Sequence, residues 1–251
     1  MVINLHEGYK KANLFFTPDN ASSYDIVVKI ATLGRDRFWK KRIIDALDAK
    51  LLRSSYYVSS VSLPYPFQSN TNLDLASGTG ILSGMIEREA GRHEASRNVV
   101  CLDLAFHYLQ IAKKKCARGL LTNATAELLP YRAESFDSIT SSYLSKYVNV
   151  EAVVKECWRV LKSRGLVVFH DFTYPSGWIA RSLWNFYFGL LKLVAKGVIT
   201  WAHAFNDLDR VIKSSNWVHK TSQALRVNGF SNIIIRFYTM QTSAIVLGQK
   251  P

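Results

Sequence analysis

The sequence has 251 residues, of which 48% are hydrophobic, so the chain is long enough to bury one large core and is not expected to be disordered. Its three cysteines, Cys101, Cys116 and Cys157, stand singly without paired spacing, which argues against a disulfide framework and predicts no metal site. The formal net charge of +13 either attracts an anionic partner, such as nucleic acid or an acidic membrane surface, or serves only solubility.

The two places where a targeting or membrane segment would be sought carry none. The amino terminus, MVINLHEGYKKANLFF, lacks the apolar core and small residues of a secretory signal. Arg181, Lys192 and Lys196 interrupt the most hydrophobic region, so no stretch approaches the roughly 18 apolar residues of a membrane span. We therefore expect a cytoplasmic protein whose contact with a membrane, if it has one, is peripheral.

Taken in chain order, the sequence alternates short β-branched runs with helical patterns, which is typical of a parallel sheet covered by helices. Within residues 8–50 it predicts helix with a break at Gly34. The elements expected next are a strand at 71–76, a helix at 81–91, a strand at 98–104, a helix at 105–119, strands at 119–126 and 136–143, a helix at 150–165 and a strand at 166–172. After an aromatic-rich region at 174–228, two strands at 231–240 and 242–250 are expected to pair antiparallel, because only a short link joins them.

This pattern predicts one α/β domain over 1–251, built on a doubly wound, mostly parallel sheet of seven strands with an antiparallel C-terminal edge. Ligands bind beyond the carboxyl ends of the strands in such sheets. We therefore expect a ligand-binding core at 70–172, a helical cover at 1–50, a second helical cover on the acceptor side at 174–228, and the C-terminal strand pair at 229–251.

The stretch NLDLASGTG, Asn72 to Gly80, combines a strand with a glycine turn, which lets the backbone come close to a nucleotide-like ligand. It lacks the third glycine of a dinucleotide fingerprint, since Ser83 stands at that position, and it lacks the Gly-Lys-Ser/Thr ending of a phosphate-binding loop. A carboxylate at Asp74 would repel pyrophosphate but suits a cation. S-adenosylmethionine, a phosphate-free nucleoside that carries a sulfonium and an ammonium, fits these conditions.

Two further strand ends support the same ligand. Asp103 closes the second strand, where a carboxylate can accept hydrogen bonds from both ribose hydroxyls. TAELLP, Thr125 to Pro130, follows the third strand, where adenine would lie against backbone amides and small side chains.

At this point the sequence resembles the class I S-adenosylmethionine-dependent methyltransferases, through LDLASGTG, LDL at Asp103, AELLP, SFDSITSSY and ECWRVLKSRG. Within that class it is similar to the ubiquinone and menaquinone biosynthesis C-methyltransferases, the UbiE/MenG group. The likeness covers most of the chain, including YDIVVKIATLGRDRFWKK near the amino terminus and SSNWVHKTSQALRVNGF and TSAIVLGQKP near the carboxyl terminus.

The resemblance implies a set of cofactor-binding residues. The methionine moiety would lie among Asp74, Ala76, Gly78, Thr79 and Gly80, the ribose on Asp103 beside Leu104, the adenine by Thr125 and Ala126, and the far wall at Ser142. The sequence departs from the group at two places. Thr125 stands where the group often has Asp or Asn, and Lys146 and Tyr147 stand where the quinone enzymes usually have an Arg-Asn pair that is thought to assist deprotonation of the ring.

Methyl transfer from a sulfonium is an in-line displacement that needs alignment and exclusion of water rather than a covalent nucleophile. A phenolic acceptor would also need a group to take its proton. The candidates near the ends of the fourth and fifth strands are Tyr143, Lys146, His170 and Asp171. The bland alternatives are that His170 only packs at a strand end and that Lys146 is a surface lysine.

The acceptor has to be inferred from the segment GWIARSLWNFYFGLLKLVAKGVITWAHAF. As a helix it would place Arg181, Asn185, Lys192 and Lys196 on one stripe and leave a broad apolar face, which could bury on the sheet, wall an apolar pocket or lie on a membrane. The basic runs at 113–118 and 35–42 could be solvated, dock on a membrane or bind RNA. We expect a small lipophilic acceptor, in particular a prenylated quinol precursor. The alternatives are another small molecule, a lipid headgroup, RNA, or a cofactor-binding protein without turnover.

Overall fold

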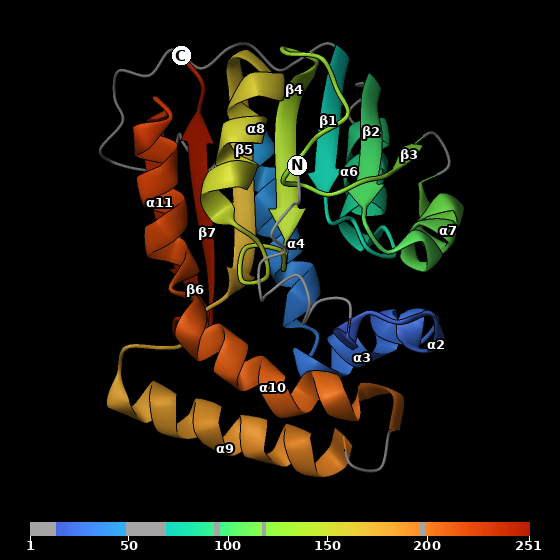
Figure 1. Ribbon diagram of the computed structural model, residues 1–251. Helices are drawn as coiled ribbons and strands as arrows, with labels where there is room; N and C mark the ends of the chain where they lie inside the picture. Colours follow the sequence, from blue (N-terminus) through green and yellow to red (C-terminus); the bar gives the residue numbers. More distant parts are fainter. Residues whose placement is uncertain (1–13, 49–68, 93–95, 117–118, 196–198) are drawn as a thin grey trace, which may run out of the picture.

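The computed structural model describes residues 14–48, 69–92, 96–116, 119–195 and 199–251. Its centre is a seven-stranded sheet of order β3-β2-β1-β4-β5-β7-β6 (Figure 1). The first five strands pair in parallel, whereas β7 runs antiparallel to both β5 and β6. Their bounds are β1 Ser69–Leu75, β2 Ser96–Asp103, β3 Leu120–Asn123, β4 Phe136–Ser142, β5 Leu161–Phe172, β6 Ser231–Tyr238 and β7 Ser243–Gln249. The predicted fold class is confirmed.

Helices cover both faces of the sheet and the end toward which β1, β2 and β4 point (Figure 1). One face carries α4 (Arg35–Leu47), α6 (Ile81–Arg92) and α7 (Phe106–Lys115), and the other carries α8 (Val150–Val160) and α11 (Trp217–Val227). Beyond the carboxyl ends of the parallel strands lie α2 (Pro18–Ala21), α3 (Tyr24–Ala31), α9 (Trp178–Ala195) and α10 (Ile199–Ser215). Of the two segments predicted as covers, α2, α3, α9 and α10 thus lie beyond the strand ends, whereas α4 and α11 pack on the faces of the sheet.

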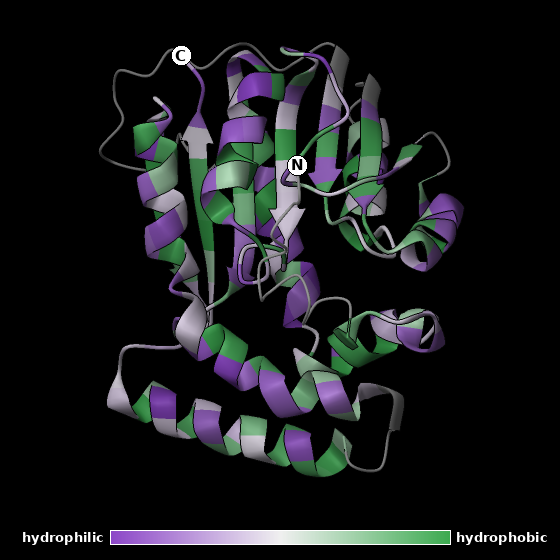
Figure 2. Ribbon diagram, viewed as in Figure 1, coloured by the Kyte–Doolittle hydropathy of each residue, from purple (hydrophilic) through white to green (hydrophobic). Residues whose placement is uncertain are grey.

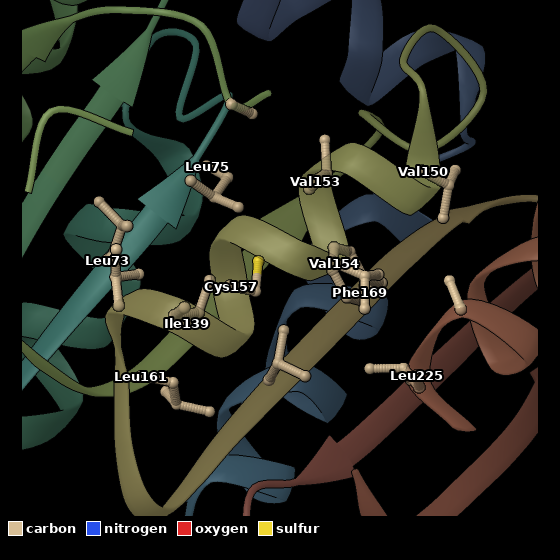
Figure 3. Packing of buried hydrophobic residues seen from close by; sticks show 14 of the residues in the cluster. Leu73, Leu75, Ile139, Val150, Val153, Val154, Cys157, Leu161, Phe169 and Leu225 are labelled. Carbon is tan, nitrogen blue, oxygen red and sulfur yellow. The ribbon is translucent and has the colours of Figure 1, made fainter. Parts of the chain in front are cut away.

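The core on the α8 face consists of buried apolar side chains from β1, β2, β4 and β5, packed against α8 and α11. Figure 3 shows valines of α8 and Cys157 packed against β1, β4 and β5, with Leu225 of α11 closing the cluster. The hydropathy colouring of Figure 2 likewise shows green, apolar residues along the central strands. This rigid core fixes the strand ends that carry the polar residues described below.

The helix predicted over 150–165 ends at Val160, five residues earlier than expected. Leu161 is already extended, with φ −79° and ψ 135°, and it pairs with Phe136 as the first residue of β5. Lys162, which falls within the predicted helix, instead forms an ion pair with Asp137, with Nζ 2.9 Å from Oδ1. Strand pairing prevails over the local helical pattern here, because it satisfies the backbone hydrogen-bonding groups of both β4 and β5.

Within the described residues, the aromatic-rich region at 174–228 forms three helices, and the apolar stretch at 177–205 within it is divided between α9 and α10. The helices α9 and α10 flank residues 196–198 and pack against each other, with Lys192 of α9 held by Asp209 of α10 at 2.7 Å. Lys196, predicted on the same stripe as Lys192, lies outside the described residues. No helix in the described part of the chain is both long and apolar enough to span a bilayer.

Candidate active site

The glycine turn after β1 depends on two left-handed glycines. Gly78 has φ +56° and Gly80 has φ +76°, a conformation that costs other residues energy. A Cβ at Gly80 would stand 3.0 Å from both Cα and Cβ of Ala112, so the turn also requires glycine for its close approach to α7. At Gly78 such a Cβ would have space, with its nearest neighbour, Tyr108, at 3.9 Å.

Asp74 lies beneath the turn rather than at its mouth. Its carboxylate is buried within the sheet, where it accepts hydrogen bonds from Ser83 and from Thr140, the latter at 3.1 Å. Burial raises the pKa of Asp74 to about 6, although both hydrogen bonds oppose the rise. The side chain therefore ties β1 to β4 and to α6 and does not line the cavity above it.

Asp103 stands at the carboxyl end of β2 with one backbone donor on each oxygen. Gly78 N donates to Oδ2 at 2.7 Å, and Ala105 N donates to Oδ1 at 2.8 Å. Burial raises the pKa of Asp103, while these backbone hydrogen bonds oppose the rise. Each carboxylate oxygen has a further lone pair, so the group can accept hydrogen bonds from a ligand.

A first cavity of about 110 Å³ opens at the ends of β1, β2 and β4, the position where the strand order reverses. Eight of the predicted residues line it: Ala76, Gly78, Asp103, Leu104, Thr125, Ala126, Ser142 and Tyr143. Among the described residues that line it, Asp103 is the one charged group, and lysine and arginine are absent. The lining fits a phosphate-free nucleoside such as S-adenosylmethionine, whereas a pyrophosphate would find no cation there.

Thr79 and Gly80 do not line this cavity. The Thr79 hydroxyl donates to Asp25 of α3, which also forms an ion pair with Lys115 of α7. These contacts fasten the N-terminal cover to the glycine turn, so Thr79 and Gly80 shape the site from outside it.

An aromatic lid over the first cavity was not predicted. Phe16, Tyr24, Tyr108 and Tyr147 all line the cavity and contact one another edge to face, with the rings of Tyr24 and Tyr108 5.4 Å apart. Asn20 accepts a hydrogen bond from the Tyr108 hydroxyl at 2.6 Å. The only sequence signal was the aromatic content of the N-terminal segment, and it does not say where those rings pack.

A second, larger cavity of about 390 Å³ lies next to the first. Its walls come mostly from apolar and aromatic side chains of α3, α4, α9 and α10. Phe16, Tyr24, Tyr143 and Tyr147 line both cavities and form the wall between them. The two cavities therefore place a polar nucleoside-like site and a large apolar site on opposite sides of one aromatic wall.

Lys146 and Asp171 form a buried ion pair at this wall, with Nζ 2.6 Å from Oδ1. Lys146 is 7% exposed and lines the second cavity, so the expectation of a surface lysine is wrong. Its ammonium also donates to the carbonyl of Tyr143 at 2.9 Å and lies 4.4 Å from the centre of the Tyr147 ring. Burial lowers the pKa of Lys146 and raises the pKa of Asp171, each against the attraction of the other.

Tyr143 connects the wall to the N-terminal cover. Its hydroxyl donates to Asp36 of α4 at 2.8 Å, and Asp36 also pairs with Lys40, whose ammonium lies 4.7 Å from the centre of the Tyr143 ring. The ring stacks on Phe172 at 4.6 Å, and the backbone at Tyr143 is left-handed, with φ +71°. Asp36 and Lys40 were not predicted as site residues, because only folding brings α4 against the end of β4.

His170 lies behind the site and lines neither cavity. Its Nδ1 is 2.9 Å from the hydroxyl of Ser142 and its Nε2 is 2.8 Å from that of Ser243. Burial lowers the pKa of His170, and the nearby Lys40 and Lys146 lower it further. The ring is therefore neutral and holds Ser142 in the wall of the first cavity.

The predicted basic clusters are partly neutralised. Lys40 is buried on Asp36, while Lys41 and Arg42 pair with Asp45 at 3.7 and 3.1 Å. Lys113 and Lys114 are exposed on α7, whereas Arg118, the end of that run, lies outside the described residues.

A family described as a methyltransferase domain matches residues 73–169. Demethylmenaquinone methyltransferase of Streptomyces avermitilis is 28% identical over 234 residues, covering 92% of this chain and 91% of the relative. Ubiquinone/menaquinone biosynthesis C-methyltransferase UbiE of Blochmanniella pennsylvanica is 29% identical over 244 residues, covering 94% and 87%.

Solved structures show the same fold at low identity. A SAM-dependent methyltransferase from Aquifex aeolicus superposes with a TM-score of 0.59 at 11% identity, covering 94% of this chain and 100% of that one. A second one from Thermotoga maritima, described as a possible histamine N-methyltransferase, has a TM-score of 0.57 at 16% identity and covers 98% and 100%.

With the sheet order and the cavity at its reversal point, these similarities identify the chain as a class I S-adenosylmethionine-dependent methyltransferase. Within that class it is similar to UbiE and the demethylmenaquinone methyltransferases over most of its length. The predictions of fold, enzyme class and cofactor are confirmed.

Proposed function

We propose that this enzyme transfers a methyl group from S-adenosylmethionine to a ring carbon of a prenylated quinol precursor. The observation that carries the proposal is the aromatic wall between a phosphate-free nucleoside cavity and a larger apolar cavity, with the buried Lys146 at that wall. The names of the relatives, which are demethylmenaquinone and ubiquinone/menaquinone methyltransferases, agree with an acceptor of this kind.

We assign the cofactor to the first cavity. Asp103 would accept hydrogen bonds from the ribose, Thr125 and Ala126 would border the adenine, and Ala76 and Gly78 would let the backbone approach the methionine part. Asp74, Thr79 and Gly80 support this site from below, since they hold the turn in shape without lining the cavity.

The second cavity would receive the acceptor. Its volume and apolar walls suit a ring with a prenyl tail, and the four shared aromatic side chains exclude water from the reacting ring. S-adenosylmethionine supplies an electrophilic methyl group on its sulfonium. The protein then has to align the ring carbon and remove the hydroxyl proton of the acceptor.

Lys146 is suited to take that proton. Burial lowers the pKa of Lys146, which favours release of a proton from its ammonium, and in the neutral form Nζ would accept the proton of the acceptor hydroxyl. The ammonium that forms is stabilised by Asp171 at 2.6 Å and by the Tyr143 carbonyl at 2.9 Å. The phenolate would raise the electron density of the ring carbon that receives the methyl group, and S-adenosylhomocysteine would leave. Release of the ring proton to water would restore aromaticity, and the Lys146 ammonium would return its proton to the acceptor oxygen.

Tyr143 and His170 act on this site in different ways. Tyr143 contributes its ring to the shared wall and is held by Asp36, so we place it as a wall residue next to the reacting groups. His170 acts through Ser142 as a positioning residue, because it lines neither cavity.

We further propose that residues 1–251 act as one domain, with residues 70–172 binding the cofactor and residues 174–228 covering the acceptor, and that the enzyme works in the cytoplasm at a membrane surface. RNA remains the competing substrate only through the net charge of +13. The cavity at the wall favours the lipophilic acceptor, since its lining is apolar.

The experiment supplies methyl-labelled S-adenosylmethionine with a reduced demethylmenaquinol that carries a short prenyl chain and, in parallel, with total RNA. We expect label on the quinol ring carbon by mass spectrometry and none on RNA. Lys146→Met serves as the matched control, with intact binding of S-adenosylhomocysteine and little label. Label on RNA alone, or none on either substrate despite cofactor binding, would contradict the proposal.

A further inference from the structure

The outer face of α9 carries exposed apolar side chains. The exposed residues recur at intervals of four and three, which places them on a single stripe: Ile179, Leu183, Phe186, Leu190 and Leu193. Trp184 and Phe188 point the other way and are buried against α10. In Figure 1, α9 lies farthest from the sheet, with α10 between them, so its outer face is at the surface of the molecule.

This stripe runs into the rim of the second cavity. Leu33, Leu183 and Met240 line the cavity although they are 75%, 55% and 61% exposed, so they form its rim. They come from the α3–α4 corner, from α9 and from the β6–β7 turn. The Tyr187 hydroxyl donates to the Ala31 carbonyl at 3.1 Å and holds α9 against α3. The cavity therefore opens to the outside between apolar side chains.

Cations lie close to this rim. Arg35 lines the cavity and is exposed, and Lys29 is exposed on α3, the helix that precedes Leu33. The whole chain carries a net charge of +13. An apolar stripe bordered by cations matches a bilayer surface with anionic headgroups, where apolar side chains insert and cations stay at headgroup level.

We propose that the outer stripe of α9 and the rim formed by Leu33, Leu183 and Met240 dock on an anionic bilayer, so that the acceptor passes from the lipid into the second cavity without crossing water. The path of the acceptor rests on the proposed function, whereas the docking does not. A second copy of this chain is the poorer occupant, because it would cover the mouth of the cavity and bring two strongly cationic molecules together.

The test measures co-flotation of the full chain with two kinds of vesicle, one of phosphatidylcholine alone and one with about 30% phosphatidylglycerol. The second approximates the negative charge of a cytoplasmic leaflet. We expect the wild type to bind the anionic vesicles. The double variant Phe186→Glu with Leu190→Glu should bind them at least about tenfold less. Neither residue lines a cavity. The matched control is Val227→Glu, where an equally exposed side chain (79%) on α11 lies away from α9, and it should bind like the wild type.

Two further measurements keep the outcomes separate. With a short-chain quinol in solution, the double variant should turn over within about twofold of the wild type, whereas a long-chain quinol in vesicles should react at least tenfold more slowly. Equal vesicle binding by the wild type and the double variant would overturn the docking. A wild type that sediments as a dimer, with a double variant that sediments as a monomer, would overturn it as well. Vesicle binding through α9 without methylation of any quinol would leave the docking and sink the proposed function.

Discussion

Replacing Asp103 by Ala tests the cofactor site most directly. The carboxylate receives one backbone N–H on each oxygen, from Gly78 at 2.7 Å and Ala105 at 2.8 Å, and lines the first cavity. The substitution removes the charged acceptor for the ribose, and a hydrogen bond to a charged group contributes about 1.5–3 kcal/mol. We therefore expect the affinity for S-adenosylhomocysteine to fall about 10- to 150-fold.

Calorimetric titration with S-adenosylhomocysteine measures this change. Asp207→Ala removes the same charge from the exposed side of α10 and should bind as the wild type does. Because Asp103→Ala also frees two backbone donors, the melting temperature without ligand is recorded for both variants. A folded Asp103→Ala protein with affinity within twofold of the wild type would refute the placement of the ribose on this carboxylate.

The remaining predictions concern the proton acceptor, the turn and the buried acid. Lys146→Met should lower kcat at least about 100-fold and leave the affinity for S-adenosylhomocysteine unchanged, and an unchanged kcat would refute the role of Lys146. Because Asp171 loses its partner, urea denaturation of this variant should show a loss of about 3 kcal/mol of unfolding free energy. Gly80→Ala should lose about 1–3 kcal/mol of unfolding free energy, since φ is +76° and α7 is 3.0 Å away, whereas Gly91→Ala, in open space on α6, should lose none. The pKa of Asp74 is raised to about 6, so its contribution to stability is present below its unfolded value near 4 and lost as pH rises through 6. Relative to Asp74→Asn, the wild type should therefore lose roughly 2–3 kcal/mol over that window, and parallel stability curves would contradict this.

The cofactor side of the site could be predicted because its signals are local. Gly78 comes two residues after a predicted strand, and Asp103 and Thr125 are each the second-last residue of one. The carboxyl ends of neighbouring parallel strands meet at one edge of the sheet. Seven of the ten residues expected at the cofactor line the first cavity, and this rule places them there without knowledge of how the covers pack. Asp74 was expected near the mouth of the turn but lies beneath it. Its sequence position does not say whether the side chain points into the sheet or into the cavity.

The acceptor side could not be predicted in the same way. Lys146 has the sequence context of a surface lysine. It is buried because Asp171 and Phe172 of β5 lie against it, while Tyr143 and Tyr147 flank it within its own turn. Asp36 meets the Tyr143 hydroxyl across more than a hundred residues of chain. The sequence that forms α9 has a broad apolar face beside its polar stripe, so its pattern does not tell which part of that face is covered.

The sequence alone determined the order of strands and helices, the glycine turn and the carboxylate that follows β2, because hydrophobic periodicity and backbone constraints act over a few neighbouring residues. Only the tertiary structure decided that two covers far apart in the chain share an aromatic wall, that a lysine there is buried beside an acid, and that the outer stripe of α9 stays exposed. These features depend on burial, and burial is settled by which distant surfaces exclude water together.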